Sequence, residues 1–202
     1  WSSDVCSSDL KRLPVEDGKI RFSSRLSLYQ KPMIGVIGVA PADGEIPTDT
    51  PDTHGGNMDC TQIGEGASVY FPVCAKGALL SLGDLHACMG DGEIGGCGVE
   101  IAGEVTLKLT VIPGCRKPYP VVVTDSLVMA VASCKTVDQA WEKAVEYLHD
   151  YMVTETELTS DEAIMLQSIA ADLSICQTVN PNKTVRMSIP LKYLEAYGYR
   201  QK

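Results

Sequence analysis

The order of apolar and polar residues predicts strands in the first part of the chain. Residues 33–39 form an unbroken apolar run of strand length, which is typical of a buried strand. Residues 104–111 alternate between apolar and polar side chains, which predicts a strand with one face in a core and the other in water. Shorter apolar runs predict further strands at residues 68–73, 78–82, 121–124 and 127–131.

Apolar residues at helical spacing follow later in the chain. Thr136-Val-Asp-Gln139 fits a capping box, and the apolar residues after it recur along one helix face as far as Met152. A second capping box, Thr159-Ser-Asp-Glu162, predicts a helix to about Leu173. Beyond it we expect strands at residues 174–179 and 184–189 around a turn at Asn180-Pro-Asn182, then a short helix from Pro190 to Gly198.

Together these elements predict a mixed fold that is β-rich at first and α+β afterwards. We expect a β-sandwich-like domain at residues 11–115 and a smaller α+β subdomain at residues 116–202. Residues 1–10 repeat Ser-Ser-Asp, do not begin with methionine and show no periodicity, which predicts a non-native leader. The alternative is a native but disordered terminus.

Composition excludes several classes of partner. The formal net charge is −9 and the pI is about 4.8, which argues against nucleic acid or an anionic membrane as a partner, because both would repel the chain. No apolar run is long enough to span a bilayer. The eight cysteines include no C-x-x-C pair, and residues 1–10 lack the pattern of a signal peptide. We therefore expect a cytoplasmic protein whose cysteines are mostly reduced and buried.

The negative charge is concentrated in one segment. Residues 43–104 contain eleven acids and one base, Lys76, together with 13 of the 18 glycines and two of the three histidines. A surface adapted only for solubility would mix charges of both signs. This segment therefore predicts a site for a cation.

Two long loops in this region carry the candidate chemistry. Residues 40–60 lack periodicity and include three prolines, and residues 83–100 include six glycines. Long loops of this kind in compact domains are usually functional or disordered. Glycine is used where the backbone adopts a positive φ or approaches a ligand closely.

The side chains of these loops are suited to binding a metal. In the first loop, His54, Asn57 and Asp59 lie within six residues, separated by paired glycines. In the second, Asp84 and His86 are two positions apart, so on an extended chain they point to the same face. A carboxylate and an imidazole in that relation are plausible zinc ligands.

Asp91 and Glu93 repeat this spacing a few residues later. Carboxylates crowded on one face would repel each other unless a cation lay among them. A solvated acidic loop is the alternative interpretation. A nucleophilic thiol is another, because Cys88 lies near His86 and Cys60 follows Asp59.

Two formal pattern matches are excluded. Gly90-Asp-Gly-Glu-Ile-Gly95 fits G-x-G-x-x-G, but its two acids would repel a pyrophosphate. An EF-hand loop beginning at Asp91 would need glutamate at its twelfth position, where Ala102 stands.

Five motifs in order resemble the acetamidase/formamidase family. They are Met33-Ile-Gly-Val-Ile-Gly-Val-Ala-Pro41, His54-Gly-Gly-Asn-Met-Asp59, Tyr70-Phe-Pro-Val73, Gly77-Ala-Leu-Leu-Ser-Leu-Gly-Asp-Leu-His-Ala87 and Met89-Gly-Asp-Gly-Glu93. The resemblance extends from about Lys31 to the C-terminus. Members of this family are longer at the N-terminus, so the resemblance implies that the chain corresponds to the C-terminal part of a member.

The resemblance also implies an activity, hydrolysis of short aliphatic amides to a carboxylic acid and ammonia. It implies homodimers or higher homo-oligomers and a divalent metal near the His/Asp-rich motifs. Zinc is favoured for ligands that include histidine, and calcium is the alternative for carboxylates alone. Two other functions stay open: a non-catalytic, metal-stabilised β module that binds a small polar ligand, and a cysteine-dependent amidase.

Each candidate residue receives an expected role on this hypothesis. The metal ligands are Asp59, Asp84 and His86; the catalytic residues are Glu93, Asp91 and His54; and the substrate-binding residues are Asn57, Gly55 and Gly56. A metal at this site would acidify a bound water and polarise the amide carbonyl. Glu93 or Asp91 would take the proton of the water and return it to nitrogen.

Overall fold

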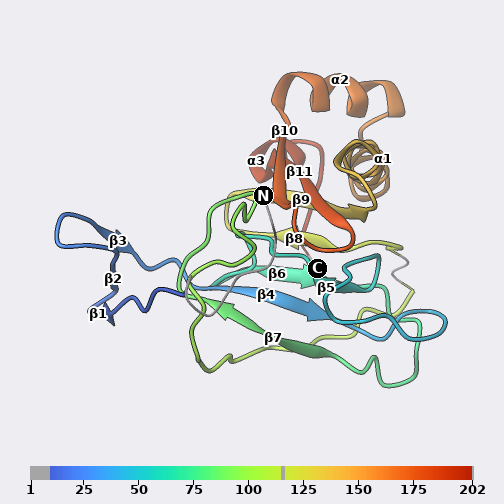
Figure 1. The fold of residues 1–202 in the computed structure, drawn as a ribbon. Coiled ribbons are helices and arrows are strands. Elements are labelled where there is room, and N and C mark those ends of the chain that lie inside the picture. The colour runs from blue at the N-terminus through green and yellow to red at the C-terminus, as the bar shows by residue number, and fades with distance from the viewer. Residues whose placement is uncertain (1–9, 115–116, 202) are drawn as a thin grey trace.

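A computed structural model describes residues 10–114 and 117–201, which form three β-sheets and three helices (Figure 1). In Figure 1 the helices lie at the top, a five-stranded sheet in the middle and a three-stranded sheet below. The predicted β-rich fold with a later α+β part is confirmed. Residues 1–9 of the expected leader, with Cys6, and Cys115 lie outside the described residues.

The first sheet is a small antiparallel meander at the side of the molecule (Figure 1). It consists of β1 (Val15–Glu16), β2 (Lys19–Arg21) and β3 (Ser27–Tyr29). Ile20 is its only buried residue within these strands. This sheet therefore contributes little to the core.

The second sheet has the order β5-β4-β7 and is antiparallel throughout. Its strands are β4 (Met33–Gly38), β5 (Gly55–Asn57) and β7 (Ser81–His86). Val36 of β4 pairs with Asn57 on one side and with Gly83 on the other. The two long loops at residues 40–60 and 83–100, although distant in sequence, are thereby joined through a single central strand.

The strand expected at residues 78–82 begins later than predicted. Gly77, Ala78 and Leu79 have φ angles of 82°, 58° and 51°, which lie in the left-handed region and turn the chain before β7. Left-handed backbone cannot continue a strand ladder. The apolar run that suggested a strand here is therefore a turn followed by the first residues of β7.

The third sheet has the order β10-β11-β9-β8-β6, with every neighbouring pair antiparallel. The strands are β6 (Ser68–Tyr70), β8 (Val121–Val123), β9 (Leu127–Cys134), β10 (Asp172–Gln177) and β11 (Lys183–Pro190). The predictions of strands at residues 121–124, 127–131, 174–179 and 184–189 are confirmed apart from their ends. Because β6 comes from the first half of the chain, this sheet joins the two parts whose boundary we expected near residue 115.

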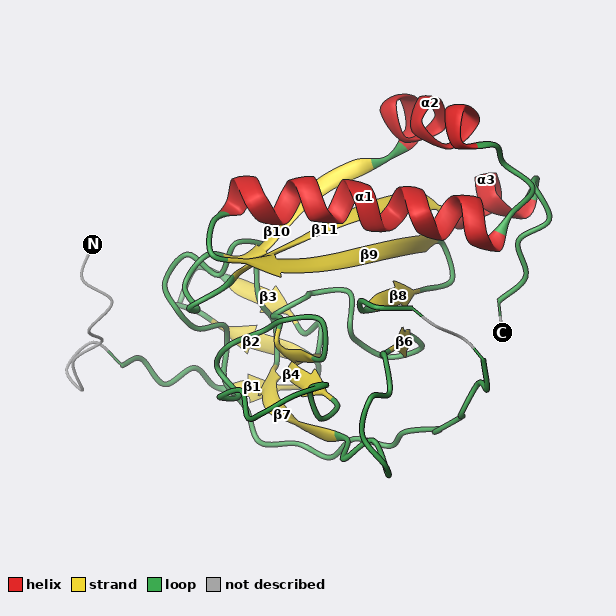
Figure 2. Ribbon diagram, turned by 90° about the vertical axis from the view of Figure 1, so that its right-hand side faces the viewer, coloured by secondary structure: helices red, strands yellow, loops and turns green. Residues whose placement is uncertain are grey.

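The helices are α1 (Val137–Glu155), α2 (Ser160–Ala170) and α3 (Leu191–Glu195). Thr136 caps α1 by accepting a hydrogen bond from the backbone of Gln139, and Thr159 and Glu162 form a complete capping box at α2. Figure 2 shows α1 lying across β9. None of the helices in the described ranges is both long and apolar enough to cross a membrane.

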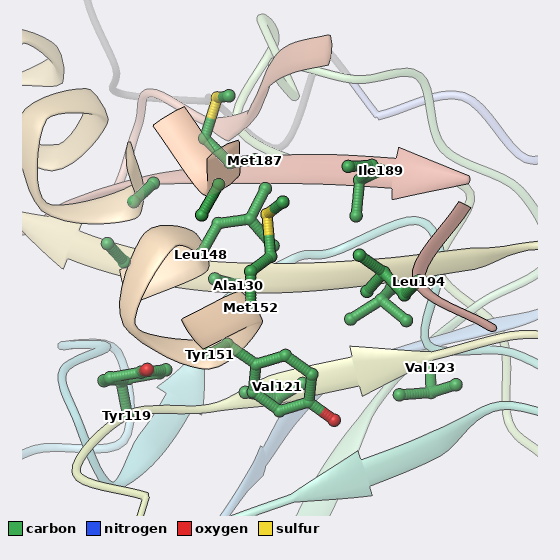
Figure 3. Close-up of a cluster of buried hydrophobic side chains, with 14 of the residues drawn as sticks. Tyr119, Val121, Val123, Ala130, Leu148, Tyr151, Met152, Met187, Ile189 and Leu194 are labelled. Carbon is green, nitrogen blue, oxygen red and sulfur yellow. The ribbon is translucent and has the colours of Figure 1, made fainter. Parts of the chain in front are cut away.

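The five-stranded sheet has an apolar core on each face. Val121 and Val123 pack with α1, whereas Val122, between them, packs toward the β5-β4-β7 sheet. This alternation follows from the two-residue period of a strand. Figure 3 shows the helix-side core, where Leu148 and Met152 of α1 lie over the sheet. The opposite core includes Ile37, Met58, Cys60, Met129 and Cys176, and it joins the five-stranded sheet to the β5-β4-β7 sheet.

Two sequence predictions are wrong. Residues 104–111 belong to no strand, and Leu109 and Val111 are 73% and 83% exposed. Alternation predicts a strand only where a neighbouring backbone supplies hydrogen bonds, and no strand of the described residues pairs with this segment. The cysteines are not mostly buried either: of the six described, only Cys60 and Cys176 are buried, and Cys74 and Cys97 are exposed.

Candidate active site

Two carboxylates lie on either side of Gly35 in β4. Asp59 follows β5, and Asp84 lies on β7. A Cβ atom at position 35 would lie 2.6 Å from Oδ1 of Asp59 and 2.7 Å from Oδ2 of Asp84, which is closer than a real Cβ can approach. Glycine at this position therefore allows the two carboxylates to converge.

His86 completes this group from the end of β7. Its Nε2 atom lies 3.4 Å from Oδ1 of Asp84 and 3.2 Å from Oε1 of Glu100. Burial lowers the pKa of His86, but the hydrogen bond to Asp84 and the charge of Glu100 outweigh burial and raise it. The Nδ1 atom is buried and has no hydrogen-bond partner among the described residues, and a Cβ on Gly98 would lie 2.6 Å from it.

Glu93 is buried against Asp59. The two carboxyl groups form a hydrogen bond, and they are 7% and 0% exposed. Burial and the charge of Asp59 raise the pKa of Glu93 to about 8. Burial and the charge of Asp84 raise the pKa of Asp59 to about 6. At neutral pH, in the absence of a cation, the pair therefore retains a proton.

Asn57 and Asn180 supply hydrogen bonds to the carboxylates. With its amide oriented to satisfy the network, Asn57 donates to Asp59 Oδ2 at 2.8 Å and to Asp84 Oδ2 at 3.1 Å. Asn180 donates to Asp59 Oδ2 at 3.2 Å and to the carbonyl of Asn57 at 3.0 Å. The turn between β10 and β11 thus contributes a side chain to the group formed by Asp59, Asp84 and His86.

Asp91 is engaged by groups of its own. Arg186 donates to its two oxygens from Nη1 at 2.9 Å and from Nη2 at 2.6 Å, and Thr61 donates to Oδ1 at 2.7 Å. Burial alone would raise the pKa of Asp91, but these hydrogen bonds lower it. Both oxygens of this carboxylate are therefore occupied.

His54 and the two glycines after it are packed tightly. His54 is buried, and burial lowers its pKa, although the charge of Asp52 acts in the opposite direction. A Cβ on Gly55 would lie 2.4 Å from the carbonyl oxygen of Ile37, and one on Gly56 would lie 3.2 Å from Thr50 O. Among the described residues, the structure records no hydrogen bond from the His54 ring to the Asp59 group. Their expected roles in binding or catalysis stay predictions.

Sequence reasoning missed three residues near the expected ones. Asn180 was interpretable only as part of a turn, and Glu100 only as one acid of a charged segment. Arg186 had a clearer signal, because it is a charged residue in the otherwise uncharged and buried run Thr184-Val-Arg-Met-Ser-Ile189. Such residues are rarely buried unless they are paired.

The ligand chemistry fits a divalent metal. Asp59, Asp84 and His86 each offer one ligand atom, and these atoms lie within 4.8 Å of one another. His86, Glu93 and Glu100 form a second group by the same measure. Two carboxylates and one imidazole are a donor set that zinc accepts. A cation would also offset the repulsion that raises the pKa of Asp59.

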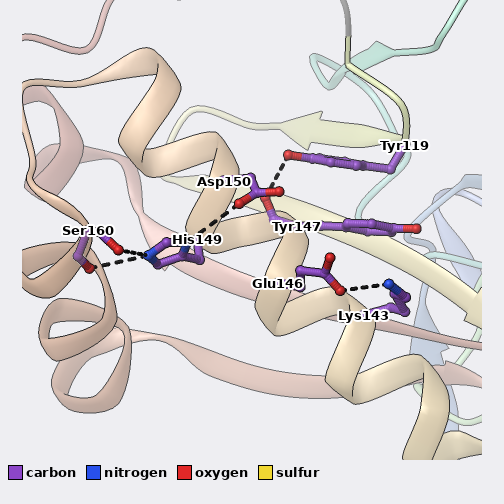
Figure 4. A network of polar contacts seen from close by, with 7 residues as sticks. All are labelled: Tyr119, Lys143, Glu146, Tyr147, His149, Asp150 and Ser160. Carbon is purple, nitrogen blue, oxygen red and sulfur yellow. Dashed lines mark hydrogen bonds and ion pairs between the residues drawn. The ribbon is translucent and has the colours of Figure 1, made fainter.

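A separate polar network on α1 is structural. Figure 4 shows His149 between Ser160 and Asp150, a set formally like a hydrolytic triad. Its Nε2 lies 3.1 Å from the Ser160 hydroxyl and 3.2 Å from the Ser160 carbonyl oxygen. A ring nitrogen that donates to the carbonyl cannot accept the hydroxyl proton. The network therefore joins α1 to the start of α2 rather than activating a serine.

Comparisons with known proteins agree with the motifs. The sequence profile of the Acetamidase/Formamidase family matches residues 40–196. A formamidase from Methylophilus methylotrophus is 47% identical over 73 residues, which cover 36% of this chain and 18% of the relative. Solved structures are similar over more of the chain.

A predicted acetamidase/formamidase from Thermoanaerobacter tengcongensis has a TM-score of 0.90 and 49% identity, covering 94% of this chain. An acetamidase from Bacillus halodurans has a TM-score of 0.89 and 48% identity, covering 92% of this chain. The chain spans 63% of the length of each of these two structures. With its profile match, its motifs and its fold, this chain belongs to the acetamidase/formamidase family.

Proposed function

We propose that this protein hydrolyses short aliphatic amides to a carboxylate and ammonia. One observation carries the proposal: the buried carboxyl of Glu93 is paired with Asp59 beside the candidate ligands Asp84 and His86. The formamidase and acetamidase names of the relatives support this substrate class.

The ligand group would hold a divalent metal through Asp59, Asp84 and His86. Bound there, the metal would supply Lewis-acid chemistry, polarising the carbonyl and making water more acidic. Asn57 and Asn180 hold the carboxylate of Asp59 by donating hydrogen bonds. Zinc is the metal that this donor set favours, and calcium is the alternative.

Glu93 is the group that we propose moves the proton. Water adds its oxygen to the amide carbon, and Glu93 accepts the proton that the water loses; Glu93 would be ionised for this step once a bound cation offset the negative charge of Asp59. When the carbon–nitrogen bond breaks, Glu93 returns this proton to the departing nitrogen, which leaves as ammonia. Asp91 is less suited to this role, because Arg186 and Thr61 occupy its oxygens. His54, with Gly55 and Gly56, is proposed to orient the amide.

Ammonia release from formamide and acetamide tests the assignment. Glu93→Gln should lower kcat about 10²-fold to 10⁴-fold, because a positioned acid or base contributes that much. Asp84→Asn should also lower activity, with weaker zinc binding. Glu104→Gln is the matched control in the exposed neighbouring segment and should retain wild-type turnover. Normal turnover in both site variants would refute the proposal.

Chelation separates the proposal from its competitors. If the protein is a metal-dependent amidase, a strong chelator should abolish ammonia release and zinc should restore it. A metal-stabilised binding module would lose thermal stability on chelation without ever releasing ammonia. A cysteine-dependent amidase would survive chelation but lose activity with a thiol alkylator.

Metal identity, assembly and location stay separate proposals. Metal analysis of the purified protein distinguishes zinc from calcium. We propose a homodimer or higher homo-oligomer, which light scattering measures, and a cytoplasmic location.

A further inference from the structure

We propose that Arg186 is a positioning residue for Glu93, acting through Asp91 and the loop of residues 90–93. This inference rests on the proposed function, because it assigns Arg186 a part in the reaction of Glu93. Arg186 lies on β11 of the five-stranded sheet, whereas Asp59 and Asp84 flank β4 of the β5-β4-β7 sheet. The loop that carries Glu93 must therefore be held between the two sheets.

The ion pair is built to fix a loop. Arg186 is 5% exposed and forms two parallel hydrogen bonds with the carboxylate of Asp91. Paired hydrogen bonds of this kind restrain orientation as well as distance. The same guanidinium lies 3.6 Å from Sγ of Cys176, and Thr61 contacts Asp91 from the segment after Asp59. The carboxylate of Asp91 thus joins three separate parts of the chain.

Backbone hydrogen bonds continue this docking toward Glu93. The amide of Gly92 donates to the carbonyl of Cys176 at 2.9 Å, and the amide of Thr178 donates to the carbonyl of Gly92 at 3.2 Å. Both partners belong to the strand β10 or follow it directly. The loop is therefore attached to the five-stranded sheet through both the amide and the carbonyl of Gly92.

The conformation of Glu93 explains why such docking is needed. Its φ angle is 45°, in the left-handed region that residues other than glycine adopt at a cost in free energy. In this conformation its carboxyl is buried against Asp59. Without the anchor at Asp91, the loop would be free to relax, and the carboxyl of Glu93 would move away from the reacting atoms.

Substitutions at Arg186 test this inference against a purely structural role. Arg186→Met should lower kcat about 10²-fold, the scale of loss expected from misplacing a reacting group by about 1 Å, with KM changed much less. Arg186→Lys should recover part of the loss by retaining the charge. Rates are measured well below the melting temperature of each variant, so that the folded fraction does not limit them.

Lys117→Met is the matched control. Lys117 forms another buried ion pair, 2.7 Å from Glu155, and it also lies over the ring of Tyr151 in the helix-side core. Its removal should lower the melting temperature while leaving kcat within about twofold of wild type. Amide hydrogen exchange at Gly92 should be faster in Arg186→Met than in wild type, and unchanged in Lys117→Met.

The outcomes separate this inference from the proposed function. If Glu93→Gln abolishes turnover but Arg186→Met leaves kcat unchanged, the positioning role is wrong and the proposed function stands. Equal losses of kcat in Arg186→Met and Lys117→Met, or unchanged exchange at Gly92, would also overturn the positioning role. If Glu93→Gln retains normal turnover, the proposed function fails and this inference fails with it.

Discussion

Gly35 lies on β4, the central strand of the β5-β4-β7 sheet, between the carboxylates of Asp59 and Asp84. Because it has no side chain, Asp59 and Asp84 approach each other across the strand. The sequence shows Gly35 only as one member of an apolar run, so its role becomes visible from the neighbours of β4. At such a position glycine is required because of the space that its neighbours leave, and not because of any chemistry of its own.

Gly35→Ala should therefore disrupt the site. The added methyl would lie 2.6 Å from Asp59 Oδ1, so the carboxylate would have to move. We expect about a 10²-fold loss of turnover, together with weaker zinc binding measured by calorimetry. Gly83→Ala, on the neighbouring strand, places its methyl in open space and should keep wild-type values. Equal effects of the two substitutions would contradict this explanation.

Asp91 predicts a pH dependence of stability. Its pKa is lowered from the ordinary value of 3.8, so the folded state favours the charged carboxylate. The stability that it contributes is present above pH 3.8 and is lost as the pH falls through the lower pKa of the folded state.

Denaturant unfolding of wild type and Asp91→Asn between pH 7 and pH 3 measures this contribution. The difference in the free energy of unfolding should be constant near neutral pH and should shrink at the acidic end. Arg186 and Lys31 are the cations whose charges act on Asp91. A difference that grows on acidification would contradict the sign of the shift.

Local sequence patterns predict structure best where an element supplies hydrogen-bond partners for its own backbone. The start of α2 is an example, because Thr159 and Glu162 bond to each other's backbone amides. The segment at residues 104–111 is the opposite case. Its alternation is as regular as that of a strand, but no partner strand within the described residues pairs with it.

Thr159→Ala should test the cap independently of the site. Loss of this N-cap should lower the free energy of unfolding by about 1 kcal/mol, because a helix amide loses its acceptor. Ser168→Ala, on the exposed side of the same helix, should change it by less than about 0.5 kcal/mol. Neither substitution should alter kcat. A loss of activity with Thr159→Ala would show that α2 communicates with the Asp59 group.

The candidate site depends on how the five-stranded sheet packs against the β5-β4-β7 sheet. The core between them contains Met58 and Cys60, which flank Asp59. It also contains Cys176, whose carbonyl oxygen accepts a hydrogen bond from the amide of Gly92. The helix-side core lies on the other face of the five-stranded sheet. Changes in the two cores should therefore have different consequences for function.

Met129→Ala and Leu148→Ala compare the two cores. Both side chains are fully buried, so each truncation should lower the free energy of unfolding by about 2–5 kcal/mol. Met129 belongs to the core between the sheets, and its truncation should also lower kcat and zinc affinity. Leu148 belongs to the helix-side core, and its truncation should lower stability alone at temperatures where the protein remains folded. Identical kinetic effects would argue against a site held by sheet packing.

Local sequence patterns are enough to predict most helices and strands and the chemical character of the candidate site. Apolar periodicity and caps predicted α1, α2 and strands such as β4, because these depend on neighbours a few residues away. The two glycine-rich loops indicated carboxylates and imidazole for a metal, and the structure brings Asp59, Asp84 and His86 together.

The residues that complete this group from distant parts of the chain become visible in the folded structure. Asn180 contacts Asp59 across 121 positions of sequence, and Arg186 binds Asp91 across 95. Both contacts arise because β10 and β11 pack beside the loops that follow β5 and β7. Such contacts depend on how strands pair and sheets stack, and that information is spread over the whole chain rather than contained in any local pattern.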